Sequence, residues 1–206
     1  MKKYLLFILF SIMNGWVVAQ TQLTGTSSQE VMQQLMNSAA SIQTMQCRFV
    51  QSKTMAMLAE PSIAEGTMHY VSPDKMRWEY ITPYASALIV NGERIIKVTD
   101  GKEEVLDAKS SRMYQGMVNI IMDCASGRKL FDATVFDVIL YDDGALWKAE
   151  MTPKRRDMKR MFAQLVFRFD KTTSIISQVE MMEASGDVTS IQFEDIRIEI
   201  ENLEKK

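Results

Sequence analysis

The chain has 206 residues with a formal net charge of -2, and 47% of the residues are hydrophobic. This length favours one domain with a substantial buried core. The charge argues against nucleic acid as the main partner, because neutralising phosphates requires a basic surface.

The N-terminus has the pattern of an export signal. Two lysines precede an apolar stretch over residues 4–12, and small residues ending at Ala19 stand before a polar glutamine. We predict cleavage after Ala19, which gives a signal peptide over residues 1–19 and a single domain over residues 20–206. The apolar stretch is shorter than the about 20 residues that cross a bilayer, so an uncleaved membrane anchor is the less favoured alternative.

Two segments have the periodicity of amphipathic helices. After the start signal Ser27-Ser28, apolar residues recur at steps of three and four and predict a helix over residues 28–45. The second segment covers residues 113–123. Its apolar face holds Met113, Met117, Ile120, Ile121 and Cys124.

Short alternating runs separated by turn residues predict antiparallel strands over most of the remaining chain. Asn91-Gly92 and Asp100-Gly101 are strong hairpin signals. The predicted strands cover residues 49–57, 66–71, 76–81, 88–90, 94–99, 103–108, 136–141, 146–151, 162–170, 174–184 and 188–200. Tight turns favour a meander, and two helices can cover only one face of so long a sheet. We therefore predict a mainly β fold with α-helices (α+β), in which a curled antiparallel sheet forms an open barrel under a helical lid.

Side chains alternate between the two faces of a strand, and one set is apolar. The set that we expect to face inward is Met55, Met57, Met68, Tyr70, Met76, Trp78 and Tyr80. The opposite set is Thr67, His69, Lys75, Arg77 and Glu79. A later apolar row is Met161, Ala163, Leu165, Phe167 and Phe169.

Methionine is unusually frequent, with 17 residues. Its flexible side chain fills irregular gaps in a core and also suits surfaces that bind varied apolar ligands. Core packing is the ordinary interpretation of these methionines, and a lipid-binding cavity is the functional alternative. Sheltering a whole acyl chain would contribute roughly 10 kcal/mol, at about 0.8 kcal/mol per buried CH₂.

The sequence contains no specific catalytic or metal-binding pattern. His69 is the one histidine, and together with two distant cysteines it does not make a zinc site. Ser72-Pro73-Asp74-Lys75 matches the Ser-x-x-Lys nucleophile motif, but its proline and aspartate favour a turn that ends a strand. We expect neither an enzyme nor a bound metal or cofactor, and a hydrolase that uses Ser72 is the alternative.

Two further features allow more than one interpretation. Cys47 and Cys124 can form a disulfide after export or remain buried free thiols, and the sequence leaves both open. A basic cluster predicts a solvated hairpin tip, with a contact to lipid headgroups or to an acidic partner as the alternative. The cluster consists of Lys154, Arg155, Arg156, Lys159 and Arg160.

Several short motifs follow one another in a distinctive order. They are Phe49-x-Gln51, Gly66-x-Met68-x-Tyr70, Pro73-x-Lys75-x-Arg77-Trp78-x-Tyr80, Pro83, Asn91-Gly92 and Met151-Thr152-Pro153-Lys154. Together they cover most of the chain after the export signal, and they resemble the periplasmic outer-membrane lipoprotein carrier family, LolA. The order and spacing of the motifs carry the resemblance, because each motif is short.

The resemblance implies an unclosed, curved antiparallel β half-barrel with an α-helical lid on its concave face. Family members accept lipoproteins from an inner-membrane transporter and pass them to an outer-membrane receptor, with the acyl chains sheltered under the lid. For this chain we expect a periplasmic, monomeric carrier of lipoproteins or other acylated lipids in a Gram-negative bacterium. The cavity residues that we predict are Met68, Tyr70, Met76, Trp78 and Tyr80 on the sheet and Met117, Ile120 and Ile121 on the lid.

One position departs from the family pattern. The family has an arginine directly before the proline that corresponds to Pro73, where it ties the lid to the barrel, and this chain has Ser72 instead. A serine is too short to replace those hydrogen bonds, so we expect the lid to be latched differently or opened more easily. A carrier of another lipid or glycolipid, and a half-barrel regulator that binds a protein, are the alternative functions.

Overall fold

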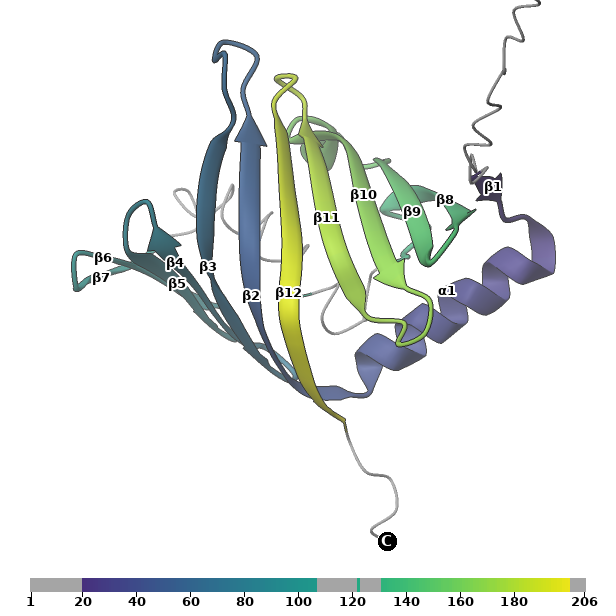
Figure 1. Cartoon of the computed structure of the whole chain (residues 1–206), viewed down its shortest axis with the longest axis horizontal. Coiled ribbons are helices and arrows are strands. Elements are labelled where there is room, and N and C mark those ends of the chain that lie inside the picture. The colour runs from purple at the N-terminus through teal and green to yellow at the C-terminus, as the bar shows by residue number, and fades with distance from the viewer. Residues whose placement is uncertain (1–19, 107–121, 123–130, 201–206) are drawn as a thin grey trace, which may run out of the picture.

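The computed structural model describes residues 20–106, 122 and 131–200, and these residues form one long antiparallel sheet with a helix beside it (Figure 1). The elements are β1 (Thr21–Gln22), α1 (Gly25–Ala40), β2 (Ile42–Thr54), β3 (Ser62–Val71), β4 (Lys75–Thr82), β5 (Ser86–Asn91), β6 (Arg94–Thr99), β7 (Lys102–Val105), β8 (Phe136–Asp143), β9 (Leu146–Pro153), α3 (Arg156–Lys159), β10 (Phe162–Asp170), β11 (Ile176–Glu183) and β12 (Val188–Ile200).

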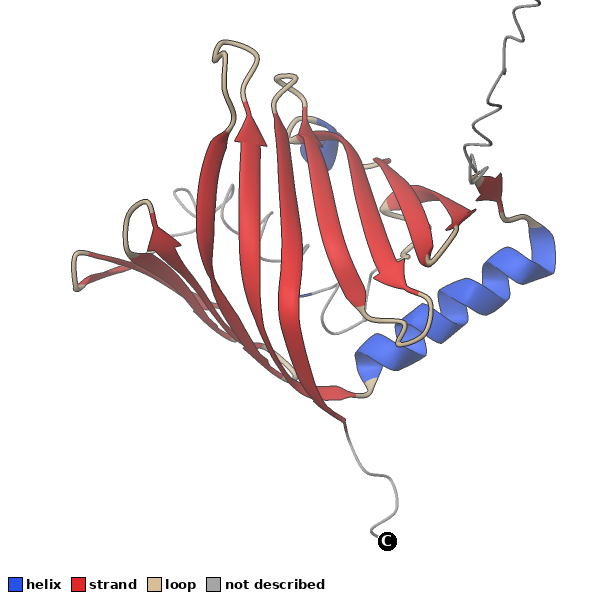
Figure 2. Cartoon of the chain, viewed as in Figure 1, coloured by secondary structure: helices blue, strands red, loops and turns tan. Residues whose placement is uncertain are grey.

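The twelve strands lie in the order β1-β8-β9-β10-β11-β12-β2-β3-β4-β5-β6-β7. Within the described residues the edge strands β1 and β7 do not pair with each other, so the sheet is not closed. The sheet is strongly curved, as Figure 2 shows. The predicted mainly β, unclosed antiparallel fold is therefore confirmed.

Two meanders make up this sheet, and the pairing of β12 with β2 joins them. These two strands have 13 residues each, and their register places Phe193 opposite Phe49. Facing residues of an antiparallel pair point to the same side of a sheet, so both phenylalanines lie in the interior. They are 5% and 1% exposed.

The hairpin signals of the sequence sit where they were predicted. Asn91 pairs with Arg94 across the β5–β6 turn. In the β6–β7 turn, Asp100 and Gly101 have φ angles of 51° and 73°. Two consecutive residues with positive φ are the requirement of a type I′ turn, which glycine and aspartate meet with little strain.

Helix α1 packs its buried residues Val31, Leu35 and Ala39 toward the sheet. Its polar side holds the connection between β10 and β11, because Gln34 Nε2 donates to Ser174 Oγ at 2.7 Å and Ser38 Oγ donates to the carbonyl of Thr173 at 3.3 Å. Figure 1 shows the helix running beside the lower ends of these strands. The helix is thereby fixed across one end of the curved sheet.

The predicted helix over residues 28–45 ran too far. Helix α1 ends at Ala40, and β2 begins at Ile42. Met45, Cys47 and Phe49 are buried at alternate positions, as a strand requires. The three-residue steps from Ala39 to Met45 fit a helix equally well, which is why the boundary was misplaced.

Two predicted inward positions were also wrong. Strand β2 ends at Thr54, and Met57 in the following turn is 96% exposed. In β10 a register shift between Phe162 and Gln164 exchanges the faces, so Phe162 is buried and Ala163 is exposed. A bulge adds a residue to one strand, and the alternation on either side of it no longer matches.

Some predictions lie outside the described residues, namely the signal peptide and most of the helix over residues 113–123. Met122 is described, and it is helical and 8% exposed in the core. No helix in the described ranges is long and apolar enough to span a bilayer.

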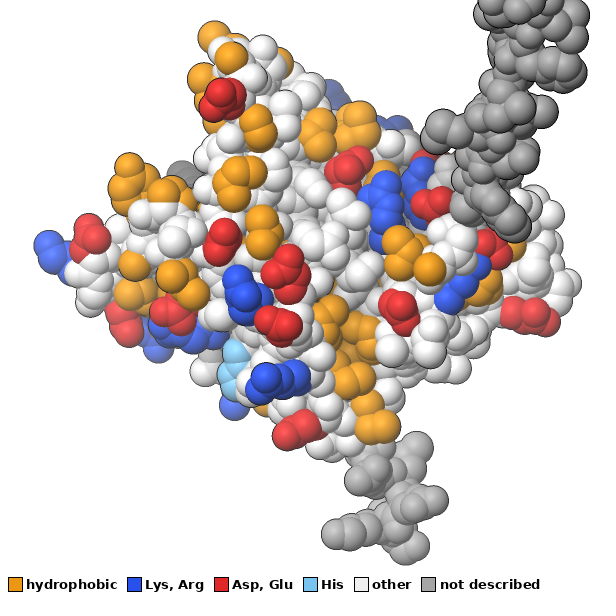
Figure 3. Space-filling model, viewed as in Figure 1, with side chains coloured by type: hydrophobic (Ala, Val, Ile, Leu, Met, Phe, Trp, Pro, Cys, Tyr) orange, Lys and Arg blue, Asp and Glu red, His pale blue; other side chains and the backbone are white. Residues whose placement is uncertain are grey.

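The outer face of the central strands is polar. Arg48 lies 3.9 Å from Glu65 and 3.7 Å from Asp195, which links β2 to both of its neighbours. Figure 3 shows charged side chains spread over this face, with separate apolar groups between them. The apolar layer therefore lies on the opposite, concave face.

Candidate functional site

Four of the predicted site residues meet on the concave face of β3 and β4. Met68 pairs with Trp78, and Tyr70 pairs with Met76. These side chains are 2%, 1%, 0% and 2% exposed, respectively. The neighbouring residues His69 and Arg77 point outward and are exposed. The structure thus brings these four together, and their role in binding lipid stays a proposal.

The remaining predicted site residues are placed differently. Tyr80 is half-buried, and its hydroxyl donates to Gln51 Oε1 at 3.0 Å. Met117, Ile120 and Ile121 lie outside the described residues.

Sequence reasoning missed the aromatic cluster around Trp78. The Phe49 ring stacks on Trp78 with centroids 4.0 Å apart and planes 23° apart, and Phe193 meets Trp78 edge-on at 6.2 Å. The alternation of Met45, Cys47 and Phe49 was the available signal. It was hidden because Met45 was assigned to the end of the helix and Phe49 to the start of the next strand, so the alternation that runs through both was not recognised.

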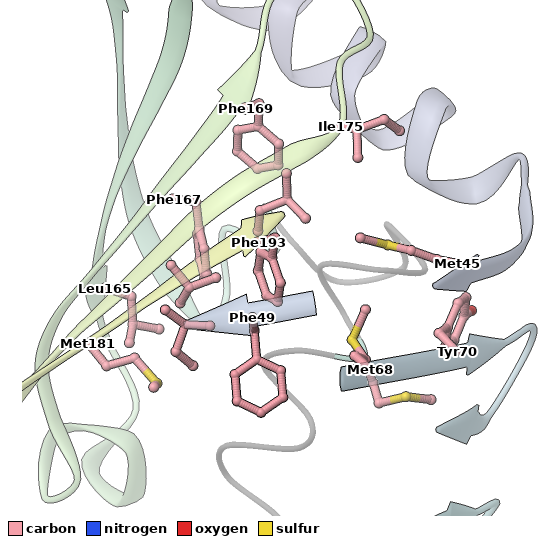
Figure 4. Close-up of a cluster of buried hydrophobic side chains, with 14 of the residues drawn as sticks. Met45, Phe49, Met68, Tyr70, Leu165, Phe167, Phe169, Ile175, Met181 and Phe193 are labelled. Carbon is pink, nitrogen blue, oxygen red and sulfur yellow. The ribbon is translucent and has the colours of Figure 1, made fainter. Parts of the chain in front are cut away.

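The second meander adds an apolar layer to the same face. Figure 4 shows Leu165, Phe167 and Phe169 from β10 in one row, close to Met181 from β11. Within the described residues the buried polar side chains are Ser174 and Thr189, and no charged side chain is buried. From β4 to β10 the described part of the concave face is therefore covered by apolar and aromatic side chains, without a buried charge.

Gly66 allows the close packing of this layer. A Cβ atom at Gly66 would overlap the carbonyl oxygen of Glu79 and would lie 2.5 Å from Cζ of Phe49. The Phe49 ring thus rests directly on the backbone of β3. This explains why the glycine occupies a buried strand position, where it usually weakens pairing.

On β3 and β4, two polar atoms interrupt the apolar layer. Among the described residues, neither Tyr70 Oη nor Trp78 Nε1 has a hydrogen-bond partner, and Trp147 Nε1 on β9 is in the same situation. Leaving a buried donor unsatisfied costs about 1–3 kcal/mol. Both atoms on β3 and β4 belong to predicted site residues. The site therefore contains two hydrogen-bond donors that have no acceptor among the described residues.

A small pocket lies at the end of α1. Its lining includes Ala39, Ile42, Met45, Phe169 and Ser174. Its volume is about 10 Å³, which is room for about one water molecule. Met45 pairs across the strands with Tyr70, so the pocket adjoins the site.

The described residues contain no metal-binding cluster, and the serine of their Ser-x-x-Lys motif lies in a turn. No cluster of His, Cys, Asp or Glu in this part of the chain could hold a metal ion. Ser72 is exposed in the β3–β4 turn, as predicted, and its hydroxyl makes no hydrogen bond to a described residue. No base in the described part of the chain is therefore hydrogen-bonded to it, as activation of a serine nucleophile requires.

Cys47 is a buried free thiol on the concave face, and Cys124 lies outside the described residues. Burial raises the pKa of the Cys47 thiol to about 12, although a hydrogen bond with the backbone of Met68 partly opposes the rise. The thiol stays protonated at neutral pH and is therefore a poor nucleophile.

The basic cluster is exposed around the single turn of α3. Lys154 pairs with Asp137 at 2.9 Å, and Arg155 pairs with Asp157 at 2.7 Å. The hydrogen bonds from Arg155 lower the pKa of the Asp157 carboxyl. Solvent exposure agrees with a solvated tip, and a partner for the cluster stays a prediction.

Sequence comparison relates the chain to carriers of lipoproteins. Residues 40–203 match the family model described as outer membrane lipoprotein carrier protein LolA. An outer-membrane lipoprotein carrier protein of Methylobacillus flagellatus is 25% identical over 158 residues, which are 76% of this chain and 73% of that protein. One of Methylibium petroleiphilum is 21% identical over 178 residues, which are 86% of this chain and 84% of that protein.

Structure comparison finds the same fold in a protein complex. A chain in the Pseudomonas aeruginosa MucA/MucB complex matches with a TM-score of 0.53 at 12% identity. The match covers 87% of this chain and 59% of that chain. At this identity the likeness shows a shared fold.

Proposed function

Because the chain belongs to the outer membrane lipoprotein carrier protein family LolA, we propose that it shelters the acyl chains of lipoproteins on the concave face of its sheet and delivers them toward the outer membrane. Proteins of this family are carriers that bind their cargo without chemical conversion. We further propose that the chain works in the periplasm after removal of residues 1–19. An inner-membrane transporter would load it, and an outer-membrane receptor would unload it.

The continuous apolar layer of the concave face is the observation that carries this proposal. It extends from Met76 and Trp78 on β4 to Leu165 and Phe167 on β10, without a buried charge among the described residues. An acyl chain lying along it would gain roughly 10 kcal/mol if wholly sheltered. That gain is large enough to withdraw a lipid from water.

Loading requires the interior to open. The pocket beside Met45 holds about 10 Å³, whereas sites for small organic ligands measure about 300–1,000 Å³. The methionines of the concave face suit such a rearrangement, because their side chains repack with little loss. Part of the gain from sheltering the chain is offset by this opening, which favours later release.

Lipid binding by the purified protein tests the proposal. The full chain is expressed in a Gram-negative host and purified from the periplasm, and its lipids are extracted for mass spectrometry. We expect a co-purified acylated lipid, and we expect a triacylated lipopeptide to displace a fluorescent acyl probe from the delipidated protein. A protein that carries no lipid and binds no probe would contradict the proposal.

A matched pair of neighbouring variants on β4 locates the binding surface. Met76→Gln keeps the length of a buried side chain but makes it polar, and we expect it to weaken probe binding about tenfold, or about 1.4 kcal/mol. Lys75→Ala removes an exposed side chain and serves as the control. Equal affinities of the two variants would place the probe elsewhere on the protein.

A half-barrel regulator that binds a protein is the second candidate function. The likeness to a chain of the MucA/MucB complex supports it at the level of fold. Affinity purification separates the candidates, since a carrier retains lipid whereas a regulator retains one defined protein and no lipid.

A further inference from the structure

Three buried donors have no acceptor among the described residues, namely Tyr70 Oη, Trp78 Nε1 and Trp147 Nε1. The first two lie together on β3 and β4, on side chains that are 0% and 1% exposed, whereas Trp147 is on β9. Native proteins pair nearly all buried polar groups, so each such exception calls for a partner. A phenylalanine in place of Tyr70 or Trp78 would have avoided the penalty.

The two donors belong to one small region of the sheet. Tyr70 pairs with Met76 on β4, and Trp78 is two residues further along that strand on the same face. Diagonal neighbours of this kind have Cα atoms about 7–8 Å apart, within reach of aromatic side chains. Figure 4 shows Tyr70 beside Met45 and Met68, so apolar groups surround its ring.

The neighbouring phenol of Tyr80 makes a useful contrast. Its hydroxyl donates to Gln51 Oε1 at 3.0 Å, so the protein itself supplies the acceptor. The donors of Tyr70 and Trp78 lie deeper, where the sheet provides methionine and phenylalanine instead of glutamine. Among the described residues no acceptor lies within hydrogen-bond reach of either donor.

The surroundings select the kind of acceptor. No charged side chain in the described residues is buried, so a carboxylate or phosphate would enter the layer without a compensating cation. A neutral carbonyl oxygen brings no such penalty and accepts from a phenol or an indole. In an apolar environment these hydrogen bonds are stronger than in water.

We propose that Tyr70 and Trp78 donate hydrogen bonds to the carbonyl oxygens that join the cargo's acyl chains to its headgroup, in ester or amide linkage. This subsite deepens the proposed carrier function and rests on it. It makes the protein select acylated molecules over ether lipids and plain hydrocarbons of equal length. It also sets how deeply a chain enters, because the carbonyl marks the end of the hydrocarbon.

Competition between matched lipids tests the subsite. The probes are a diacyl ester lipid, the diether lipid with the same chains and headgroup, and an N-acyl peptide with an amide carbonyl. We expect the wild-type protein to bind the ester lipid about tenfold more tightly than the ether lipid. The relative affinity of the N-acyl peptide then shows whether esters or amides fit better.

Single substitutions assign the preference to its donors. Tyr70→Phe and Trp78→Phe are each expected to bring the ester-to-ether ratio toward one, mainly by weakening ester binding. Tyr84→Phe alters an exposed tyrosine and is expected to keep the wild-type ratio. In the lipid-free protein, Tyr70→Phe is expected to leave the melting temperature unchanged or raise it, because it removes an unsatisfied hydroxyl.

The outcomes separate this inference from the carrier function. Equal binding of ester and ether lipids by the wild-type protein overturns the subsite and leaves the carrier function standing. An ester preference that survives both Tyr70→Phe and Trp78→Phe also overturns it. Failure of every lipid to bind overturns both proposals together.

Discussion

The two faces of strands β3 and β4 differ in what holds their side chains in place. On the concave face, Trp78 is 1% exposed and stacks on Phe49 at 4.0 Å. On the convex face, one residue away, Arg77 is exposed and donates to Glu79 at 2.8 Å. Dispersion and water exclusion thus act on one side of the sheet, and screened charges act on the other.

This difference teaches that sensitivity to mutation should alternate along a strand. We expect a charge or a rigid added group to be costly in the concave layer, and polar exchanges to have little effect on the convex face. Three experiments sharpen the comparison. Two of them set a concave position against a convex one, and the third measures the convex ion pair by itself.

The largest effect is expected when the same charge is placed on each face. Trp78→Glu removes the stacked ring and buries a carboxylate, and should lower the free energy of unfolding by about 4 kcal/mol or more. His69→Glu puts the charge on an exposed position opposite Arg77 and should change it by less than about 0.5 kcal/mol. Urea denaturation measures both, and similar losses would mean that the faces are not energetically distinct.

A smaller loss is expected from a single added methyl group. Gly66→Ala places a Cβ atom against the carbonyl of Glu79 and the ring of Phe49, and should destabilise the protein by about 3 kcal/mol. Thr67→Ala, the next residue on the convex face, should cost less than about 1 kcal/mol. If Gly66→Ala unfolds at the wild-type urea concentration, both the Phe49 ring and the backbone at Glu79 move aside without cost, which would contradict the tight packing.

The smallest effect concerns the convex ion pair. The hydrogen bond from Arg77 lowers the pKa of Glu79, so the pair contributes stability above the ordinary carboxyl pKa of 4.5 and loses it as pH falls through the lowered value. Both groups are exposed, so Arg77→Ala should cost less than about 0.5 kcal/mol at neutral pH. Thermal unfolding in low and high salt checks this, and a larger, salt-independent loss would point to packing by the arginine stem.

The sequence was informative where structure depends on neighbours along the chain. The alternation of apolar residues predicted which side chains of β3 and β4 face inward, because side-chain period is a local property. Asn91-Gly92 and Asp100-Gly101 predicted the β5–β6 and β6–β7 turns, because positive φ is also a local property. The same rule failed at Ala163, where a bulge shifts the register by one residue.

What the sequence could not show depends on contacts between distant segments. Phe49 and Phe193 meet because β2 and β12 pair, and no short window contains both strands. The unsatisfied donors of Tyr70 and Trp78 are a property of their surroundings, so the identity of the residues did not reveal them. The tight fit at Gly66 likewise depends on the backbone of β4.

Within the described residues the unclosed sheet has two edge strands, and the unpaired backbone groups of an edge can recruit strands from other molecules. Here one edge is the two-residue strand β1, and the other is β7, whose four residues are all exposed and include Lys102, Glu103 and Glu104. A short edge strand offers few backbone hydrogen bonds to another strand. A charged edge strand is repelled by the same strand of a second molecule. The sheet can therefore stay unclosed while its edges offer little opportunity for edge-to-edge aggregation.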